Sequence, residues 1–291
     1  MARRLTAMLC LALTAAWVGA CGGDDADPEA ASTRVGDPGP VHVHGLGVNP
    51  SDDALYIAAH TGLFRLPDGA ERATRVGDRW QDTMGFTVVG PDRFLASGHP
   101  DGREDLPPFL GLIASTDAGG TWQPVSLLGE KDFHVLEAFD DRVWGFGSDF
   151  RTRREQLLVS RDGGRTWSER RTPQPLASLA LDPDDPAKAI ASGANALYAT
   201  GDEGRSWQRI DSDAGLLAWP AADRLFRAAS DGSVAVSRDR GAHWQRVGEI
   251  PGEPAAFEAA GGELFAALHD GTIVRSVDGG RSWSVRLAPA G

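Results

Sequence analysis

The sequence predicts an all-β protein, a six-bladed β-propeller with four antiparallel strands in each blade. Two observations lead to this fold: an octapeptide recurs five times at similar intervals, and short strand-like segments fill the intervals between its copies. A period near forty residues combined with strand-like sequence is typical of propeller blades. A chain of 291 residues is long enough for one such domain and an N-terminal leader.

The octapeptide has the pattern S/T-x-D-x-G-x-x-W. Its copies are STDAGGTW (115–122), SRDGGRTW (160–167), TGDEGRSW (200–207), SRDRGAHW (237–244) and SVDGGRSW (276–283). The pattern is typical of a tight turn between two strands, in which aspartate accepts backbone N–H groups and glycine supplies a positive φ. The tryptophan is expected to pack the turn against its blade. We therefore expect structural roles for Asp117, Asp162, Asp202, Asp239 and Asp278, and for Trp122, Trp167, Trp207, Trp244 and Trp283.

Division of the chain at these turns gives six units, each of which contains four short strand-like segments. The first unit begins with VHVHGLGVNP (41–50), and Asp68 marks a degenerate turn that lacks the tryptophan. The second and third begin at TMGFTVVG (83–90) and FHVLEAF (133–139), and the last three at LASLALDP (176–183), GLLAWPA (215–221) and AAFEAAG (255–261). The propeller is expected over residues 41–288, which leaves no sequence for a seventh blade.

The N-terminal residues indicate export. Residues 1–20 combine a charged start with an apolar run that ends in small residues, which is typical of a signal peptide. The segment VGAC (18–21) resembles the lipobox of bacterial lipoproteins, which implies that Cys21 is lipidated. Residues 21–40 are small, polar and proline-bearing, as in a flexible tether. We therefore expect a protein anchored by lipid to the extracytoplasmic face of the cell membrane.

Charge and cysteine content limit which ligands and which cross-links are expected. The formal net charge of −12 argues against nucleic acid as a ligand. Of the two cysteines, Cys10 lies in the predicted leader, so the mature domain is expected to form no internal disulfide and to be held by its core or by a metal. We expect a monomer.

The five octapeptides resemble the Asp-box, or BNR, repeats of sialidases, oligoxyloglucan hydrolases, the sortilin-type receptor propeller and a photosystem II assembly factor. The stretches VHVHGLGVNPSDDALYIAAHTGLFRL and MGFTVVGPDRFLASGHP also resemble a group of bacterial lipoproteins named as sialidase-like glycosyl hydrolases. In Asp-box families the boxes lie on the face opposite the ligand, so the resemblance implies that the box tryptophans do not stack on sugars. It implies a fold more firmly than a chemistry.

Six of the seven histidines are predicted to lie on the face opposite the boxes, and the exception is His243, inside a box. In a propeller, the start of each innermost strand and the end of each second strand lie on that face. Three of them, His42, His44 and His134, start innermost strands, and the other three, His60, His99 and His269, end second strands. The first five are the candidate metal ligands. Imidazoles gathered at a channel mouth are suited to bind Zn or Cu, or a polar ligand such as a glycan or a protein segment. Alternatively, each histidine simply bonds to a loop carbonyl.

A glycoside hydrolase is the alternative function. It needs two carboxyl groups across the scissile bond, and the loops 99–108 and 148–156 offer Asp101, Glu104 and Asp149 as candidates. Sialidase chemistry also needs a tyrosine nucleophile and an arginine triad. The only tyrosines, Tyr56 and Tyr198, are predicted to lie inside strands, and the arginine motif that opens sialidase domains is missing. The sequence thus favours binding, with hydrolysis by non-sialidase chemistry as the second hypothesis.

Overall fold

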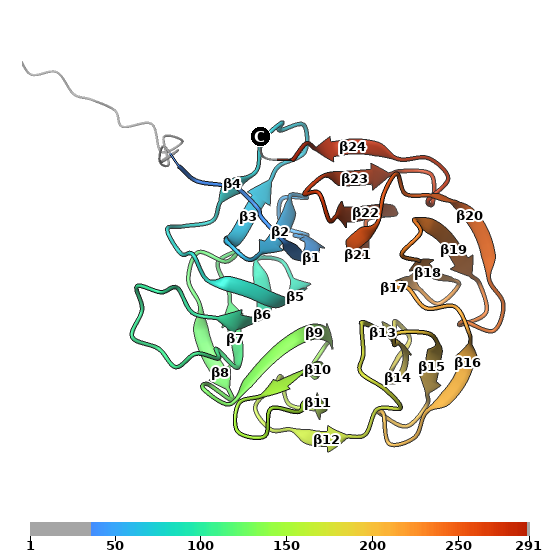
Figure 1. The fold of residues 1–291 in the computed structure, drawn as a ribbon, viewed down its shortest axis with the longest axis horizontal. Helices are drawn as coiled ribbons and strands as arrows, with labels where there is room; N and C mark the ends of the chain where they lie inside the picture. The colour runs from blue at the N-terminus through green and yellow to red at the C-terminus, as the bar shows by residue number, and fades with distance from the viewer. Residues whose placement is uncertain (1–35, 290–291) are drawn as a thin grey trace, which may run out of the picture. The chain divides into compact units, whose positions relative to one another are not determined.

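Six four-stranded antiparallel sheets surround a central channel in the computed structural model, which describes residues 36–289 (Figure 1). Each sheet takes four consecutive strands in chain order, so each blade is a simple meander. The predicted fold, a six-bladed propeller with four strands per blade, is therefore confirmed. None of the described residues forms a helix, so no helix among them spans a membrane. The predicted signal peptide and the lipidated Cys21 lie outside the described residues.

The first three blades are β1 (Val43–Val48), β2 (Leu55–Ala59), β3 (Gly62–Leu66) and β4 (Thr74–Arg75); β5 (Asp82–Gly90), β6 (Arg93–His99), β7 (Leu112–Ser115) and β8 (Gln123–Ser126); and β9 (Lys131–Phe139), β10 (Arg142–Asp149), β11 (Glu155–Ser160) and β12 (Ser168–Arg170). The last three are β13 (Ser178–Asp182), β14 (Asp185–Ser192), β15 (Leu197–Thr200) and β16 (Gln208–Asp211); β17 (Leu216–Ala221), β18 (Arg224–Ala228), β19 (Ser233–Ser237) and β20 (Gln245–Glu249); and β21 (Pro254–Ala260), β22 (Glu263–Leu268), β23 (Ile273–Ser276) and β24 (Ser284–Leu287).

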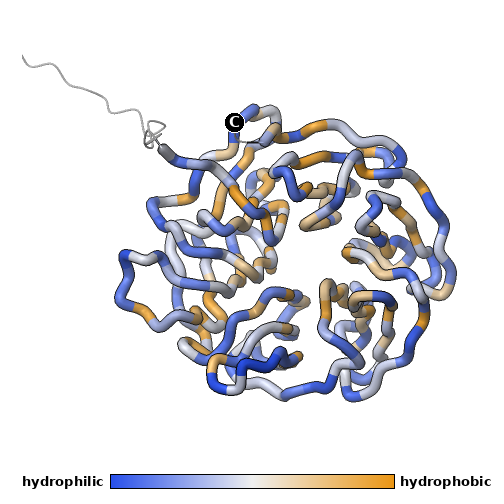
Figure 2. Tube along the Cα trace, viewed as in Figure 1, coloured by the Kyte–Doolittle hydropathy of each residue, from blue (hydrophilic) through white to orange (hydrophobic). Residues whose placement is uncertain are grey.

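The hydrophobic core lies between neighbouring blades. One cluster joins Tyr56 of blade 1 to Phe94 of blade 2, and another joins Trp144 of blade 3 to Leu179 of blade 4. Figure 2 shows hydrophobic residues recurring along the strands, with hydrophilic residues dominating the outer connections. Because each sheet is buried on both faces by its neighbours, the ring depends on contacts between blades rather than on one central core.

The Asp-box turns have the expected geometry. In blade 3, the Asp162 carboxylate accepts the N–H of Thr166 at 2.8 Å, and the hydroxyl of Thr166 donates to the same carboxylate at 2.6 Å. The hydroxyl of Ser160 donates to Asp162 and accepts the N–H of Gly164, both at 2.8 Å. These hydrogen bonds lower the pKa of Asp162 to about 2. The boxes therefore fix the turn between the third and fourth strands of five blades by side-chain hydrogen bonds.

Each box also contacts the preceding blade. The box glycine of blade 3, Gly164, has a φ of +82°, and its Cα faces the buried Leu112 of blade 2 so closely that a Cβ would clash. Gly241 in blade 5 faces Ile190 of blade 4 in the same way. The glycine is thus needed both for a left-handed backbone and for close approach of two blades.

The ring closes without a shared strand, because blade 1 contains only N-terminal strands and blade 6 only C-terminal ones. A cluster containing Phe64 of blade 1 and Phe265 of blade 6 joins them. Arg286 donates to the carbonyl oxygen of Ala70 at 2.7 Å, and Arg275 pairs with Asp68 at 3.2 Å. Asp68, the residue of the degenerate turn, thus lies at the closing interface.

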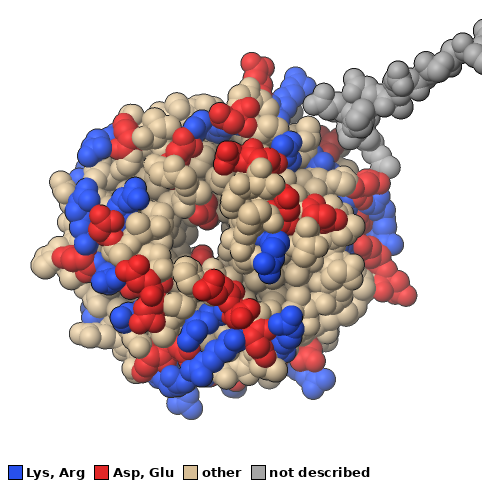
Figure 3. All heavy atoms as spheres, turned by 180° about the vertical axis from the view of Figure 1, so that it is seen from behind, with Lys and Arg blue, Asp and Glu red and all other residues tan. Residues whose placement is uncertain are grey.

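The channel is bounded by the six innermost strands, and Figure 3 shows its opening from behind, with acidic side chains visible inside it. A pocket of about 150 Å³ near the box side is lined by Glu137 of β9 and Glu258 of β21, among apolar residues such as Trp219. Burial raises the pKa of Glu258 to about 7, and it also raises the pKa of Glu137, with the charge of Glu258 adding to this effect.

Candidate functional site

The first two blades bring histidines to the face opposite the boxes. The box turns bond to the turns between first and second strands; for example, the N–H of Gly163 donates to the carbonyl oxygen of Asp141 at 2.8 Å. Val43 at the start of β1 pairs with Ala59 at the end of β2, so these two strand ends lie together. They are at the far end of the strands from the turn that joins β1 to β2, and therefore on the face opposite the boxes. The N–H of His60 donates to the carbonyl oxygens of Val41 and His42, both at 3.1 Å. Backbone pairing therefore fixes His60 beside the start of β1.

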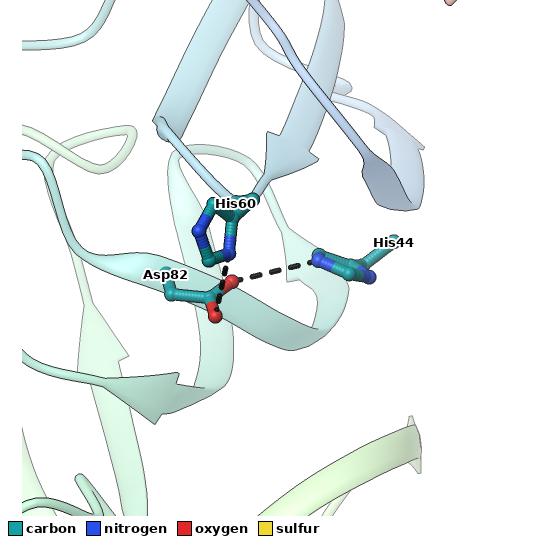
Figure 4. Close-up of side chains that lie close together, drawn as sticks. All are labelled: His44, His60 and Asp82. Atoms are coloured by element: carbon teal, nitrogen blue, oxygen red, sulfur yellow. Dashed lines mark ion pairs between the residues drawn. The ribbon is translucent and has the colours of Figure 1, made fainter. Parts of the chain in front are cut away.

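Asp82, at the start of β5, lies at the centre of the cluster (Figure 4). Its Oδ2 is 2.9 Å from His60 Nδ1 and 3.2 Å from His99 Nδ1, while its Oδ1 is 3.5 Å from His44 Nε2. His44, His60 and Asp82 each offer one ligand atom, and these atoms lie within 4.8 Å of one another. Three imidazoles from two blades thus surround one carboxylate, whose side chain is only 13% exposed.

Asp132, at the start of β9, extends the cluster into blade 3. Its Oδ2 is 2.9 Å from His134 Nε2 and 3.4 Å from His99 Nε2. His99 therefore lies between Asp82 and Asp132, with one ring nitrogen towards each carboxylate. The result is a continuous chain of alternating imidazoles and carboxylates across three blades.

The electrostatics of the cluster follow from this alternation. Burial by itself would raise the pKa of Asp82, but the imidazoles of His44, His99 and His60 outweigh it and hold the pKa well below its usual range. The hydrogen bond to Asp82 raises the pKa of His99 against the opposing effect of burial, and Asp132 likewise raises the pKa of His134. Asp82 therefore stays ionised at neutral pH and attracts positive charge.

Three buried polar atoms in this cluster make no hydrogen bond to any part of the chain that the structure describes. They are His44 Nε2, Asp82 Oδ1 and Asp132 Oδ1. Buried polar atoms of this kind normally find a partner, because an unpaired one costs about 1–3 kcal/mol. Here an imidazole nitrogen and a carboxylate oxygen face each other without a hydrogen bond. A metal ion would bind both atoms, and a polar ligand would hydrogen-bond to them.

Four of the five histidines predicted as metal ligands lie in this cluster: His44, His60, His99 and His134. The ring of His42 lies beside that of His60, with centroids 6.3 Å apart, and has no recorded contact with either carboxylate. Asp82 and Asp132 were not among the predicted site residues. The available signal was position: each stands at the start of an innermost strand, in QDTMGF and KDFHVL, as His44 does in HVHGLG.

The three candidate carboxylates for hydrolysis each pair with a cationic side chain. Asp101 accepts the N–H of Trp80 at 2.9 Å and pairs with Arg103. Glu104 pairs with Arg79 at 2.9 Å. Asp149 pairs with Lys131 at 2.6 Å, and the Lys131 ammonium holds its pKa below the usual range. The Arg103 guanidinium likewise outweighs burial and keeps the pKa of Asp101 low.

Aromatic side chains border the cluster on the blade 2 and blade 3 side. The ring of Phe109 lies 5.6 Å from that of His99, and Phe150 lies 5.5 Å from Phe109. Phe150 is 38% exposed. Phe150 belongs to the predicted loop 148–156, and Phe109 directly follows the predicted loop 99–108, so apolar contact area is available beside the imidazoles.

The fold and its five boxes define the chain as a BNR-like, or Asp-box, six-bladed propeller. Residues 111–235 match the family model described as sortilin, neurotensin receptor 3. No curated protein matches the chain at a significant level of sequence similarity.

Solved structures share the fold at low identity. An ancestral GH74 enzyme is 15% identical with a TM-score of 0.54; the match covers 83% of this chain but only 36% of that enzyme. YCF48 from Cyanidioschyzon merolae is 15% identical with a TM-score of 0.54, and 86% of each chain is covered. A gluconolactonase from Xanthomonas campestris is 16% identical with a TM-score of 0.61, covering 79% of this chain and 84% of that one. At these identities the likeness concerns the fold alone.

Proposed function

We propose that this protein is a lipid-anchored binding propeller that holds a transition-metal ion, Zn²⁺ or Cu²⁺, at the channel mouth through His44, His60 and Asp82. One observation carries the proposal: His44 Nε2 and Asp82 Oδ1 are buried, face each other and make no hydrogen bond within the described residues. The metal would supply the partner that both atoms lack. The polar or aromatic group of a glycan or protein ligand would then be recognised at the metal and the neighbouring rings.

The donor set and its spacing support a metal. With bonds of 2.0–2.1 Å, two ligands of a tetrahedral zinc ion lie about 3.3 Å apart. The separation of 3.5 Å between His44 Nε2 and Asp82 Oδ1 is close to this value. The separation of 2.9 Å between His60 Nδ1 and Asp82 Oδ2 is that of a hydrogen bond, so His60, whose side chain is 61% exposed, would turn slightly on binding.

A site with three protein ligands leaves a further coordination position. Three-ligand zinc sites commonly hold water or a ligand there, whereas structural sites are closed by four protein ligands. His99 would act from outside the coordination shell, because its Nδ1 lies 3.2 Å from Asp82 and orients that carboxylate. Phe109 beside His99 would shield one side of the position.

The carboxyl groups of this face favour binding over hydrolysis. A glycosidase needs one protonated carboxyl group beside an ionised one. Asp82, Asp101 and Asp149 all have pKa values below the usual range because cations or imidazoles surround them. The carboxyl groups with raised pKa, Glu137 and Glu258, line the pocket near the box side of the channel instead.

The test is zinc and copper binding by the purified protein, measured by elemental analysis and by calorimetric titration at pH 7.5. We expect one equivalent of metal, and the variants Asp82→Asn and His44→Gln should weaken the affinity by about a hundredfold or more, since each loses a ligand. His243→Gln is the matched control, because His243 is an exposed imidazole that pairs with Asp239 in a box. It should bind metal like the unmodified protein.

Two results would contradict the proposal. One is the absence of stoichiometric binding of either metal, and the other is an equal loss of affinity in His243→Gln and His44→Gln. Turnover of a glycoside panel by metal-free protein would instead support the hydrolase alternative.

A further inference from the structure

Glu203 shows how one inter-blade gap on the box face is filled. It follows the box aspartate of blade 4, is 2% exposed, and reaches the preceding blade. Arg161 of blade 3 donates to both carboxylate oxygens through Nε, at 2.9 and 3.0 Å. Arg142 of blade 3 and Arg205 of blade 4 lie 3.3 and 3.4 Å from the same carboxylate. Three arginines therefore enclose one buried carboxylate between blades 3 and 4.

The same three arginine positions recur between blades 5 and 6. Arg224 begins the second strand of blade 5 opposite Ala221, as Arg142 begins that of blade 3 opposite Phe139. Arg238 precedes its box aspartate as Arg161 does, in SRDRGAHW and SRDGGRTW. Arg281 stands three residues after its box aspartate, as Arg205 does. The repeat thus supplies a second set of three arginines.

The carboxylate of the first set has no counterpart in the second, because the residue at the position of Glu203 is Gly279. No atom lies within 4 Å of the point where a Cβ on Gly279 would stand. A pocket of about 210 Å³ opens there, lined by Arg224, Arg238 and Arg281. Its apolar walls come from Phe226, Val236, Val247, Leu264 and Pro220.

The three arginines around this pocket have few ion-pair partners, so they remain available to bind a ligand. Arg238 has no recorded ion pair among residues 36–289, and Arg224 lies 3.9 Å from the exposed Asp223. Arg281 donates to the backbone oxygen of Asp278 at 2.7 Å. Two carboxylates also line the pocket, but each is already engaged: Glu263 pairs with Arg275, and Asp278 accepts hydrogen bonds of its own box.

The interface between blades 4 and 5 also uses this position for charge pairing. There the residue after the box aspartate is Arg240, which pairs with Asp182 at 2.8 Å and with Asp184 at 2.7 Å in the preceding blade. The signs are reversed, but the side chain again reaches back from the box to the blade before it. The gap at Gly279 therefore differs from these two interfaces, where the same position carries a paired, charged side chain.

We propose that the pocket between blades 5 and 6 binds the carboxylate of a ligand, which takes the place that the side chain of Glu203 occupies between blades 3 and 4. The apolar walls suit a short hydrophobic body next to the carboxylate. Two sources share this chemistry: a free small organic acid and the acidic side chain of a peptide. The pocket lies on the box face, so it is independent of the metal centre proposed above.

The first experiment asks whether the three arginines hold a carboxylate. Gly279→Glu restores the missing group, and Gly279→Gln has the same size and backbone demand without the charge. A positive φ is acceptable here, because Glu203 and Arg240 have φ values of 60° and 58° at the same position. We expect the melting temperature of Gly279→Glu to exceed that of Gly279→Gln by about 2 °C or more at low salt, and the difference to shrink in 1 M NaCl.

The second experiment measures ligand binding by NMR titration. The probes are benzoate and the acetylated, amidated tripeptide Ala-Glu-Ala, with benzamide and Ala-Gln-Ala as uncharged counterparts. We expect saturable binding of an acid and not of its counterpart, weakened about tenfold by Arg238→Gln and abolished by Gly279→Glu. Gly279→Ala adds only a methyl group into open space, as Ala118 does in blade 2, and should still bind.

Each outcome decides the proposal. Binding of benzoate alone identifies a free acid as the ligand, and binding of the tripeptide alone identifies an acidic side chain. The proposal is overturned if neither acid binds, even if Gly279→Glu is stabilised, because the arginines would then accept only a tethered carboxylate. Equal binding of benzamide, or unchanged binding in Arg238→Gln, would overturn it as well.

Discussion

The two faces of this propeller are built in different ways. On the box face, the same hydrogen bonds recur in five blades: the aspartate and the serine or threonine of each box hold one turn, and a glycine lets that turn approach the preceding blade. On the opposite face, blades 1 to 3 each contribute different residues to one cluster around Asp82 and Asp132. Blade 1 supplies two histidines, whereas blades 2 and 3 each supply one aspartate and one histidine.

This difference separates structural from functional demands. A residue that recurs in every blade meets a demand common to every blade, namely a tight turn packed on its neighbour. A residue that occurs in one blade is free of that demand, so its chemistry can serve a single site. On the box face, a pocket remains at Gly279, where blade 6 lacks the charged side chain that Glu203 and Arg240 supply in blades 4 and 5.

The largest effect is expected from breaking the approach of one box to its neighbour. Gly164→Ala forces an alanine into a φ of +82° and places a Cβ against the buried Leu112, so we expect a loss of about 3 kcal/mol in the free energy of unfolding. Denaturant titration measures it. Gly279→Ala is the control, because Gly279 has a similar φ of +74° but open space around the Cβ, and it should cost only the backbone strain of about 1–2 kcal/mol. Equal losses in the two variants would contradict the inter-blade role of the box glycine.

A smaller effect is expected from the box serine. Ser160 is 1% exposed, accepts the N–H of Gly164 and donates to Asp162. Ser160→Ala leaves that N–H without a partner, which should lower the free energy of unfolding by about 2 kcal/mol in the same titration. Ser168→Ala, on an exposed position of β12, should change it by less than about 0.5 kcal/mol. A stability loss confined to Ser168→Ala would refute the role of the hydroxyl.

The smallest effect is expected on the histidine face and depends on pH. The pKa of His99 is raised above its ordinary value of 6.5, so protonated His99 stabilises the fold below that pH, and the contribution is lost as pH rises through the raised pKa. The pKa of Asp82 is lowered from 3.8, so its contribution is present above that value and lost as the pH falls through the lowered pKa. In metal-free protein, the melting temperature of the unmodified chain should exceed that of His99→Gln most near pH 5 and least near pH 9.

Zinc binding should show the opposite dependence, because a metal ion needs neutral imidazoles. Affinity should therefore rise between pH 5 and pH 8, as calorimetric titration at several pH values would show. A difference between the melting temperatures of the unmodified chain and His99→Gln that grows towards pH 9 would argue against the ion pair between His99 and Asp82.

Much of the fold was predictable because it repeats. Five copies of one octapeptide set the number and phase of the blades, and the phase placed His44, His60, His99 and His134 on one face. Asp82 and Asp132 were missed because nothing in their local sequence distinguishes them from other charged residues at strand starts. Asp101, Glu104 and Asp149 were chosen as hydrolase candidates because their loops are charged, yet each has an ion-pair partner nearby in space.

The sequence by itself determined the toroid, because turn chemistry and strand alternation are local and are written into every repeat. Only the tertiary structure decided which side chains meet, because the residues of the His–Asp cluster and of the arginine pocket come from different blades. Their distances depend on how neighbouring blades are packed and rotated. That packing brings His44 to Asp82, and it sets Arg224 and Arg238 of blade 5 beside a glycine of blade 6.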